Sequence, residues 1–311
     1  MQGLTPMITA FITSALRQAT PLTLAGLGVA FSEKSGVLNI GEEGIMLSGA
    51  FVGFIIAFFT DNLHLGILGG ALGGLLIAMI HAFMSIHCKT DQTITGLALN
   101  FFTQGLTSFL FLLAFGNGSK LPSIQKLKAI RIPLLSDIPF VGQALGNQNI
   151  FVYLLYLVII LSCIVMFKTE WGINLIAVGE NPKAADSAGL DVFRTRYLAC
   201  AVNGLLGGLG GAYITLGQLG YFQEDIISGK GYIALVTVML GRHHPVFILL
   251  SAMIIGFAES LQFTFQTMGI PLPSQAFSIL PYVFAVLVLL FSIGRSSAPA
   301  SLGVPYDRDK R

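Results

Sequence analysis

The feature that most constrains this chain is a succession of long apolar runs separated by short polar segments. Six runs are long enough to be membrane-spanning helices, because a bilayer core of about 30 Å needs about 20 apolar residues in a helix. Three shorter runs are expected to tilt or to enter the membrane as broken helices. The long runs are 66–86, 94–115, 150–167, 197–217, 246–266 and 275–293, and the shorter ones are 19–31, 44–60 and 226–241.

The composition supports the same fold class. Charged residues make up 10% of the 311 residues and hydrophobic residues 54%, whereas globular chains carry about 25% charged residues. A soluble enzyme and a disordered protein are therefore excluded, and a net charge of only +2 argues against a nucleic-acid partner. The runs are continuous and do not alternate, so a β-barrel is excluded as well. We predict an all-α integral membrane protein, a polytopic bundle of about 8–9 segments in one transmembrane domain covering residues 1–311.

The distribution of Lys and Arg predicts the orientation, since cytoplasmic segments are enriched in basic residues. With the N-terminus outside and the C-terminus inside, the inner segments hold most of the 17 basic residues. In this topology residues 1–18 form an interfacial N-terminal helix, residues 168–196 a cytoplasmic loop, and residues 294–311 a cytoplasmic tail. The inner basic residues are Lys34, Lys89, Lys168, Lys183, Arg194, Arg196, Arg242, Arg295, Arg308, Lys310 and Arg311.

The loop 168–196 contains signals for a short helix. Asn181 is a good N-cap, Pro182 suits the first helical position, and Gly189 suits the C-terminal stop. A helix of about two turns is marginal alone and needs a partner surface. The segment is either an ordinary solvated loop or a docking helix for another subunit.

A second polar segment, residues 32–44, lies between two of the shorter apolar runs. Glu42 and Glu43 are expected at the N-terminus of the following helix, where the helix dipole favours negative charge. The segment is either a cytoplasmic turn or a broken helix whose backbone faces a cavity in the membrane.

Few polar side chains occur inside the spans. Asn100 and Gln104 are four residues apart, and Ser108 extends the same stripe. Glu259 lies inside a long span with Gln262 on the same face, and an intramembrane carboxylate needs a cavity, a partner or a proton. These stripes either line a pathway or make interhelical hydrogen bonds.

Motifs for catalysis are absent from the sequence. It contains no G-x-x-x-x-G-K-[ST], no H-E-x-x-H and no G-x-S-x-G. Three widely spaced cysteines and the adjacent His243 and His244 offer no metal-ligand spacing. We predict no catalytic residue, no metal site and no ATPase site of the chain's own.

Three stretches together resemble a known family. They are residues 16–51, which include LRQATP and SEKSGVLNIGEEGIMLSGAF, residues 179–196, GENPKAADSAGLDVFRTR, and residues 229–245, GKGYIALVTVMLGRHHP. The chain resembles the permease subunits of ABC-type importers for simple sugars and nucleosides, the group that includes ribose and branched-chain amino acid permeases. It is most similar to the shorter permease of the nucleoside systems.

The resemblance implies roles for particular residues. Residues 179–196 match the cytoplasmic region that couples the permease to its ATPase, and the N-[IL]-G-x-E-G motif is expected near the translocation pathway. Glu42, where an apolar residue is more usual, and the His243–His244 pair depart from the family pattern. The implied coupling residues are Glu180, Asn181, Pro182, Ala184, Ala185, Gly189 and Arg194. The pathway residues, from the motif and from the spans, are Asn39, Gly41, Glu43, Gly44, Asn100, Gln104, Glu259 and Gln262.

The expected function is therefore half of an import pathway for nucleosides or simple sugars in the bacterial inner membrane. The resemblance implies a second, longer permease, two ATP-binding subunits or one tandem ATPase that bind ATP and Mg²⁺, and an external substrate-binding lipoprotein. The rival hypotheses are a stand-alone ion-coupled transporter that uses Glu259 as its proton site, and a membrane enzyme.

Overall fold

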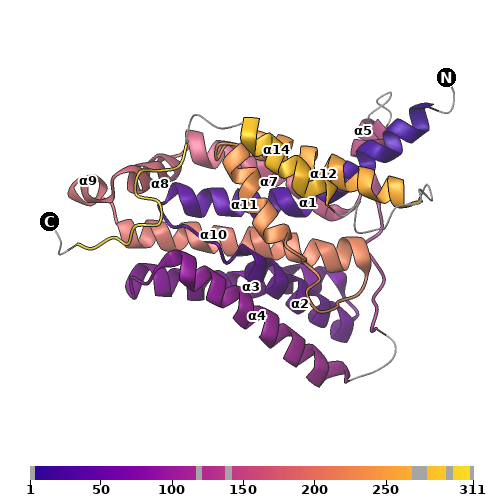
Figure 1. Cartoon of the computed structure of the whole chain (residues 1–311), viewed down its shortest axis with the longest axis horizontal. Helices are drawn as coiled ribbons and strands as arrows, with labels where there is room; N and C mark the ends of the chain where they lie inside the picture. Colours follow the sequence, from indigo (N-terminus) through magenta and orange to yellow (C-terminus); the bar gives the residue numbers. More distant parts are fainter. Residues whose placement is uncertain (1–3, 117–120, 137–141, 268–278, 292–296, 309–311) are drawn as a thin grey trace.

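The computed structural model describes residues 4–116, 121–136, 142–267, 279–291 and 297–308. These residues are mostly helical, and most of the long helices run roughly along the long axis of the molecule (Figure 1). The chain termini lie at opposite ends of that axis.

The helices of the first half are α1 (Leu4–Lys34), α2 (Glu42–Thr60), α3 (Leu63–Ala82) with its π-helical end η1 (Phe83–His87), and α4 (Gln92–Phe115). Next come the short elements β1 (Ile130–Arg131), α5 (Pro133–Ser136), α6 (Gly142–Gly146) and β2 (Asn147–Gln148), with β1 and β2 paired antiparallel. The second half contains α7 (Ile150–Lys168), α8 (Glu170–Glu180), α9 (Pro182–Ser187), α10 (Val192–Ala212) with its π-helical end η2 (Tyr213–Leu219), α11 (Lys230–Leu240), α12 (Pro245–Thr267) and α14 (Leu280–Phe291).

Six helices of the described residues are long and apolar enough to cross a membrane. Five coincide with long runs of the sequence, and the sixth, Glu42–Thr60, is a full-length helix where the sequence predicted a short one. The run 226–241 does contain a shorter helix, the 11 residues of α11. The run 275–293 lies partly outside the described residues, within which α14 has 12 residues.

The first helix differs from the prediction. Residues 4–18 do not form a separate short helix but continue into the following run as the 31-residue α1, with Pro21 inside it. Proline cannot donate to the carbonyl four residues earlier, and an unsatisfied carbonyl in a membrane is costly. The Gln218 side chain donates to that carbonyl, on Arg17, at 2.9 Å, so the helix passes through the proline without a break.

Glycines bring α2, α3 and α10 into direct backbone contact. A Cβ on Gly49 would collide with the backbone of Gly208, and one on Gly74 would collide with the Gly204 carbonyl oxygen. Small residues four apart allow this approach, and the sequence has such pairs at Gly49 and Gly53, Gly70 and Gly74, and Gly204 and Gly208. These three helices form one half of the helical core.

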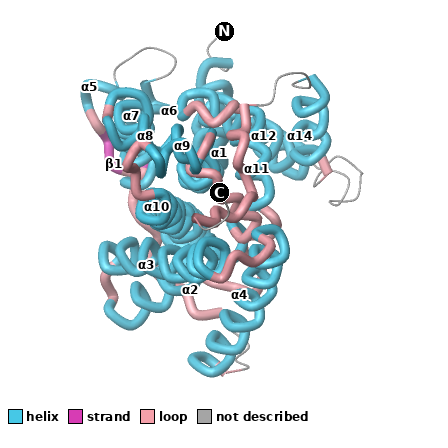
Figure 2. Tube along the Cα trace, turned by 90° about the vertical axis from the view of Figure 1, so that its left-hand side faces the viewer, coloured by secondary structure: helices cyan, strands magenta, loops and turns pink. Residues whose placement is uncertain are grey.

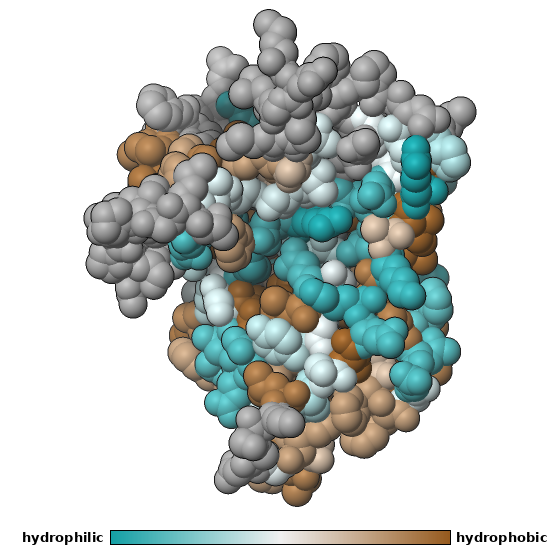
Figure 3. Space-filling model, turned by 90° about the vertical axis from the view of Figure 1, so that its right-hand side faces the viewer, coloured by the Kyte–Doolittle hydropathy of each residue, from teal (hydrophilic) through white to brown (hydrophobic). Residues whose placement is uncertain are grey.

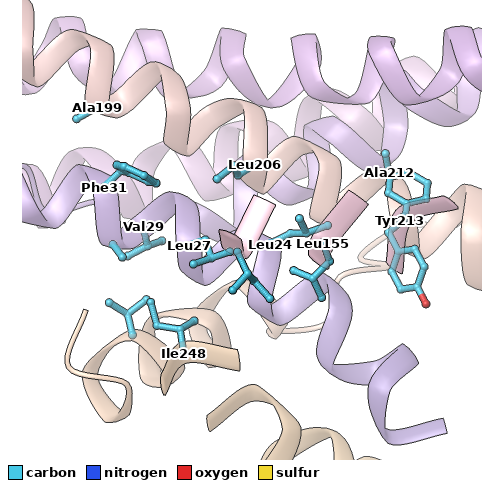
Figure 4. Packing of buried hydrophobic residues seen from close by; sticks show 14 of the residues in the cluster. Leu24, Leu27, Val29, Phe31, Leu155, Ala199, Leu206, Ala212, Tyr213 and Ile248 are labelled. Carbon is cyan, nitrogen blue, oxygen red and sulfur yellow. The ribbon is translucent and has the colours of Figure 1, made fainter. Parts of the chain in front are cut away.

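The other half of the core surrounds α1. Figure 4 shows Leu24, Leu27 and Phe31 of α1 packed among side chains of neighbouring helices, including Leu155 of α7 and Ile248 of α12. The outer helix faces are apolar too: Phe101 and Leu113 of α4 are 70% and 73% exposed. Apolar side chains on both the inside and the outside suit a protein surrounded by lipid.

Candidate functional site

Two interruptions of the helical structure meet inside the bundle. The chain leaves α1 at Lys34, runs through residues 35–41 and re-enters helix at Glu42, while residues 220–229 precede the short helix α11. Both Glu43 carboxylate oxygens accept hydrogen bonds from the start of α11, at 2.7 Å from the Gly229 and Gly231 nitrogens. The N-terminus of a helix has free N–H groups and a positive dipole end, and a buried carboxylate satisfies both.

Buried amides hold the segment before α2. Asn39 donates to Asn203 of α10 at 2.7 Å, and Asn203 donates to Glu42 Oε2 at 2.8 Å. The other oxygen of Glu42 is buried and has no hydrogen-bond partner among the described residues. Because burial of polar groups is tolerated only with such bonds, Asn203 fixes the position of Glu42.

On the opposite side, Asn100 of α4 holds the same segment. Its side-chain oxygen accepts from the Gly44 nitrogen at 2.8 Å, and its amide nitrogen donates to the Ile40 carbonyl and to the Tyr232 hydroxyl. The segment is therefore tied to α4, α10 and α11 at once, and we call residues 39–44 with these partners the buried node.

A cavity of about 720 Å³, lined by both polar and apolar side chains, lies beside the buried node. Lys230 of α11 and Glu259 of α12 line it and form an ion pair, with Nζ 2.7 Å from both carboxylate oxygens. Figure 3 views the right-hand end of the molecule in Figure 1, and hydrophilic side chains gather across the middle of that end. The further polar and aromatic lining residues are Ser14, Arg17, Gln18, Lys126, Asn149, Gln218, Ser228, Gln262, Phe263 and Tyr282.

The structure groups most of the predicted pathway residues and excludes one. Asn39, Gly41, Glu43, Gly44 and Asn100 meet in the buried node, where Gly41 donates to the Asn39 side chain at 2.9 Å. Glu259 and Gln262 line the cavity.

Gln104 is the exception, because its side chain is exposed on α4. The buried face of this helix continues from Asn100 through Thr103 and Thr107, whereas Gln104 and Ser108 of the predicted polar stripe lie toward the outer side of this chain. The four-residue spacing was correct for a helix face, but α4 packs against the bundle on the side of Thr103.

Two contributors were not predicted. Asn203 lies within an apolar span, and an amide in such a place is itself a signal of a functional or packing role. Lys230 is the first residue of α11, and its ion pair with Glu259 joins α11 to α12. The departures from the family pattern also acquire partners: Glu42 binds Asn203, and His243 Nε2 lies 2.6 Å from Glu33 Oε2.

The short helix that the loop 168–196 signals is present as α9. The Asn181 side chain accepts from the Ala184 nitrogen at 3.1 Å, Pro182 is the first helical residue, and Gly189 has φ of +87°. Ala185 faces inward, whereas Glu180, Asn181, Ala184, Gly189 and Arg194 are exposed at the molecular end opposite the N-terminus (Figure 1). The helix prediction is confirmed, and its surface is open to another subunit.

Comparison with known proteins decides the family. The family model described as "branched-chain amino acid transport system / permease component" matches residues 11–292. This chain belongs to that family of ABC transporter permeases. It is 35% identical over 314 residues to the guanosine ABC transporter permease protein NupQ of Bacillus subtilis, covering 98% of both chains. It is 34% identical to the nucleoside ABC transporter permease protein NupC of Lactococcus lactis, covering 96% of this chain and 97% of the relative.

A solved metal-chelate type ABC transporter in an inward-facing conformation shares the permease fold, with a TM-score of 0.54 and 18% identity over 91% of this chain and 84% of that one. Each of the two organisms also has a second permease that matches this chain: the guanosine permease NupP of Bacillus subtilis and the nucleoside permease NupB of Lactococcus lactis are 25% and 26% identical to it. This permease is accordingly a multi-pass membrane protein of a transport system, as its apolar helices require.

Proposed function

We propose that this permease forms half of a pathway that imports nucleosides, driven by ATP hydrolysis on separate subunits. The observation that carries the proposal is the meeting of two interrupted helices around Glu43, beside a cavity with both polar and apolar lining residues. Transporters place polar groups and helix ends near the membrane midplane in this way. Relatives whose names specify guanosine and nucleosides support the substrate class.

The cavity lining also favours a nucleoside. The Phe263 and Tyr282 rings and several aliphatic side chains offer apolar surface for a flat base, while amides such as Gln18 and Gln218 suit ribose hydroxyls. Binding sites for small polar ligands combine these two kinds of surface. A monosaccharide, which is smaller and lacks the base, is the second candidate.

We place the N-terminus outside and the C-terminus inside a bacterial inner membrane, with about 8–9 segments of which α11 crosses only part of the bilayer. Lys183 lies in α9, Arg308 pairs with Asp186 of that helix, and Lys89 pairs with Asp307 next to Arg308. This grouping of basic residues around α9 suits the cytoplasmic side. The partners are a second permease, ATP-binding subunits that hold ATP and Mg²⁺ and contact α9, and an external binding lipoprotein. The existence of NupP beside NupQ supports the second permease.

The proton-coupled alternative is disfavoured by the relatives and by the site. A carboxyl group that carries protons across a membrane has to gain and lose them in turn, but Glu259 is held by Lys230 at 2.7 Å and is only 6% exposed. The ion pair makes Glu259 a structural part of the cavity wall.

Uptake of labelled guanosine tests the proposal in proteoliposomes that contain the full complex and the binding protein. We expect uptake to require ATP on the side of the membrane that carries α9. Excess unlabelled nucleoside should suppress this uptake, whereas excess glucose should not. Uptake by this chain alone under a pH gradient without ATP would contradict the proposal.

The coupling residues give a second prediction. Glu180→Lys or Arg194→Glu is expected to abolish ATP-dependent uptake, because reversed charge on an exposed docking surface repels the partner. Amounts in the membrane should stay normal, since both side chains are exposed. Normal uptake by either variant would show that these residues do not couple the permease to its ATPase.

A further inference from the structure

The last described segment of the chain, residues 297–308, lies across the molecular end that carries α9. We call it the strap. Figure 2 views this end and shows the C-terminus in front of the helix ends, near α1, α9 and α10. The strap forms no helix or strand, yet its residues bond to the end of α8, to α9, to α10 and to the turn that follows α1.

One set of strap contacts holds the end of α8 and the docking helix α9. Ser301 donates its backbone N–H to the Gly179 carbonyl at 3.0 Å, and Ala300 donates to Glu180 Oε2 at 3.3 Å. Arg308 pairs with Asp186 of α9 at 3.0 and 3.1 Å. Tyr306 is only 6% exposed and belongs to one apolar cluster with Ala185, the inward-facing residue of α9, and with Val178 and Val192 of the flanking helices.

A second set of contacts holds the core. Gly303 donates to the Gly36 carbonyl at 3.1 Å, in the turn that follows α1. The buried Arg196 donates to the carbonyls of both Ser35 and Val304, so its guanidinium joins the turn to the strap. The Ser297 hydroxyl oxygen lies 3.1 Å from His243 Nδ1, and the Ser297 carbonyl oxygen accepts a hydrogen bond from Lys34 Nζ.

The two sets of contacts meet where Gly179 of α8 packs closely against Lys34 and where Ser301 packs closely against Gly36. A Cβ on Gly179 would collide with the Lys34 carbonyl oxygen, and one on Gly36 would lie 2.8 Å from Ser301 Oγ. Backbone packed on backbone cannot relax by rotating side chains, so movement of Gly179 toward this turn presses directly on Lys34, two residues before Gly36. From Gly36 the chain runs through the mostly buried residues 37–41 directly to Glu42 and Glu43.

We propose that the strap is a positioning element that makes α8, α9 and the turn after α1 move as one body, so that displacement of α9 reaches the buried node. The inference rests on the proposed function, because the displacement comes from an ATP-binding subunit. α8 already meets this turn through the close contact of Gly179 with Lys34, and the strap adds hydrogen bonds on both sides of that contact, to Gly179 and to Gly36. The contact resists approach of the two segments, and the hydrogen bonds of the strap resist their separation.

The test compares three point variants in the complete transport complex. Tyr306→Ala removes the ring that packs on α9, whereas Tyr306→Phe retains it. Val304→Ala is the matched control, because the Val304 side chain is 55% exposed and the carbonyl that Arg196 binds is unchanged. We expect Tyr306→Ala to lower the number of guanosine molecules imported per ATP hydrolysed by about fivefold or more, the lower end of typical coupling between sites. Tyr306→Phe and Val304→Ala should remain near wild type.

A second measurement does not depend on transport. Hydrogen exchange on the purified permease should accelerate at the Gly41 and Gly44 amides, which the node holds, in Tyr306→Ala but not in Val304→Ala. Unchanged exchange together with an unchanged import ratio would overturn the inference, as would loss of the ATP-binding subunit from the Tyr306→Ala complex, which would make the strap a docking element. If wild-type uptake proves independent of ATP, the proposed function fails, and the exchange measurement still decides whether the strap positions the node.

Discussion

Replacing Gly211 by alanine is expected to prevent accumulation of folded permease. The added Cβ would collide with the carbonyl oxygen of Met46 and lie 2.6 Å from its carbonyl carbon, so α10 and α2 would have to separate. Overpacking a core typically costs about 1–3 kcal/mol and occasionally more. We expect the cost of this substitution to lie at the upper end of that range, because no change of side-chain rotamer relieves a collision with backbone.

The measurements are the yield of monodisperse protein in detergent and the Tm of that protein. Both are compared with the same values for the Gly105→Ala variant. Gly105 lies on the exposed face of α4, and a Cβ there meets nothing within 4 Å. Alanine is the better helix former by about 1 kcal/mol, so this control should be neutral or slightly stabilised. Equal yields and Tm for the two variants would mean that close approach of α2 and α10 is not required for folding.

How far the sequence predicts this structure depends on the range of each signal. α9 was predictable because its determinants are local: Asn181 caps a helix that begins at the next residue, and Gly189 ends it. The glycine contacts of α2, α3 and α10 followed from spacing within single helices. The single helix α1 was not predictable, because the group that satisfies the Arg17 carbonyl is Gln218, 201 residues away.

The same distinction separates the predicted and unpredicted parts of the buried node. Glu42 and Glu43 were placed at a helix start because the change from polar to apolar residues is visible in the sequence. The role of Asn203 depends on Asn39, 164 residues earlier, and periodicity carries no information about which helices become neighbours. The same limit applies to Gln104, which is exposed, because the spacing predicts which residues share a face of α4 but not the side on which α4 packs.

The node supplies the second prediction, in which Glu43→Gln loses most transport activity. Each Glu43 oxygen accepts one N–H at 2.7 Å, from Gly229 and from Gly231. A glutamine side chain has one acceptor and one NH₂ donor, so one of the two N–H groups at the start of α11 would face another donor. An unsatisfied buried donor costs about 1–3 kcal/mol, which corresponds to about 5- to 150-fold in rate if the cost falls on the transport-competent state.

Glu42→Gln is the matched control for this change, since it alters the neighbouring carboxyl in the same way. Glu42 has a single hydrogen bond among the described residues, from Asn203 to Oε2, and the oxygen of a glutamine amide can accept it. Initial rates of ATP-dependent guanosine uptake, normalised to the amount of assembled complex, should therefore fall far more in Glu43→Gln than in Glu42→Gln. Equal rates in the two variants would show that the bonds from Glu43 to the start of α11 do not support transport, and the meeting of the two interrupted helices would then be a matter of packing alone.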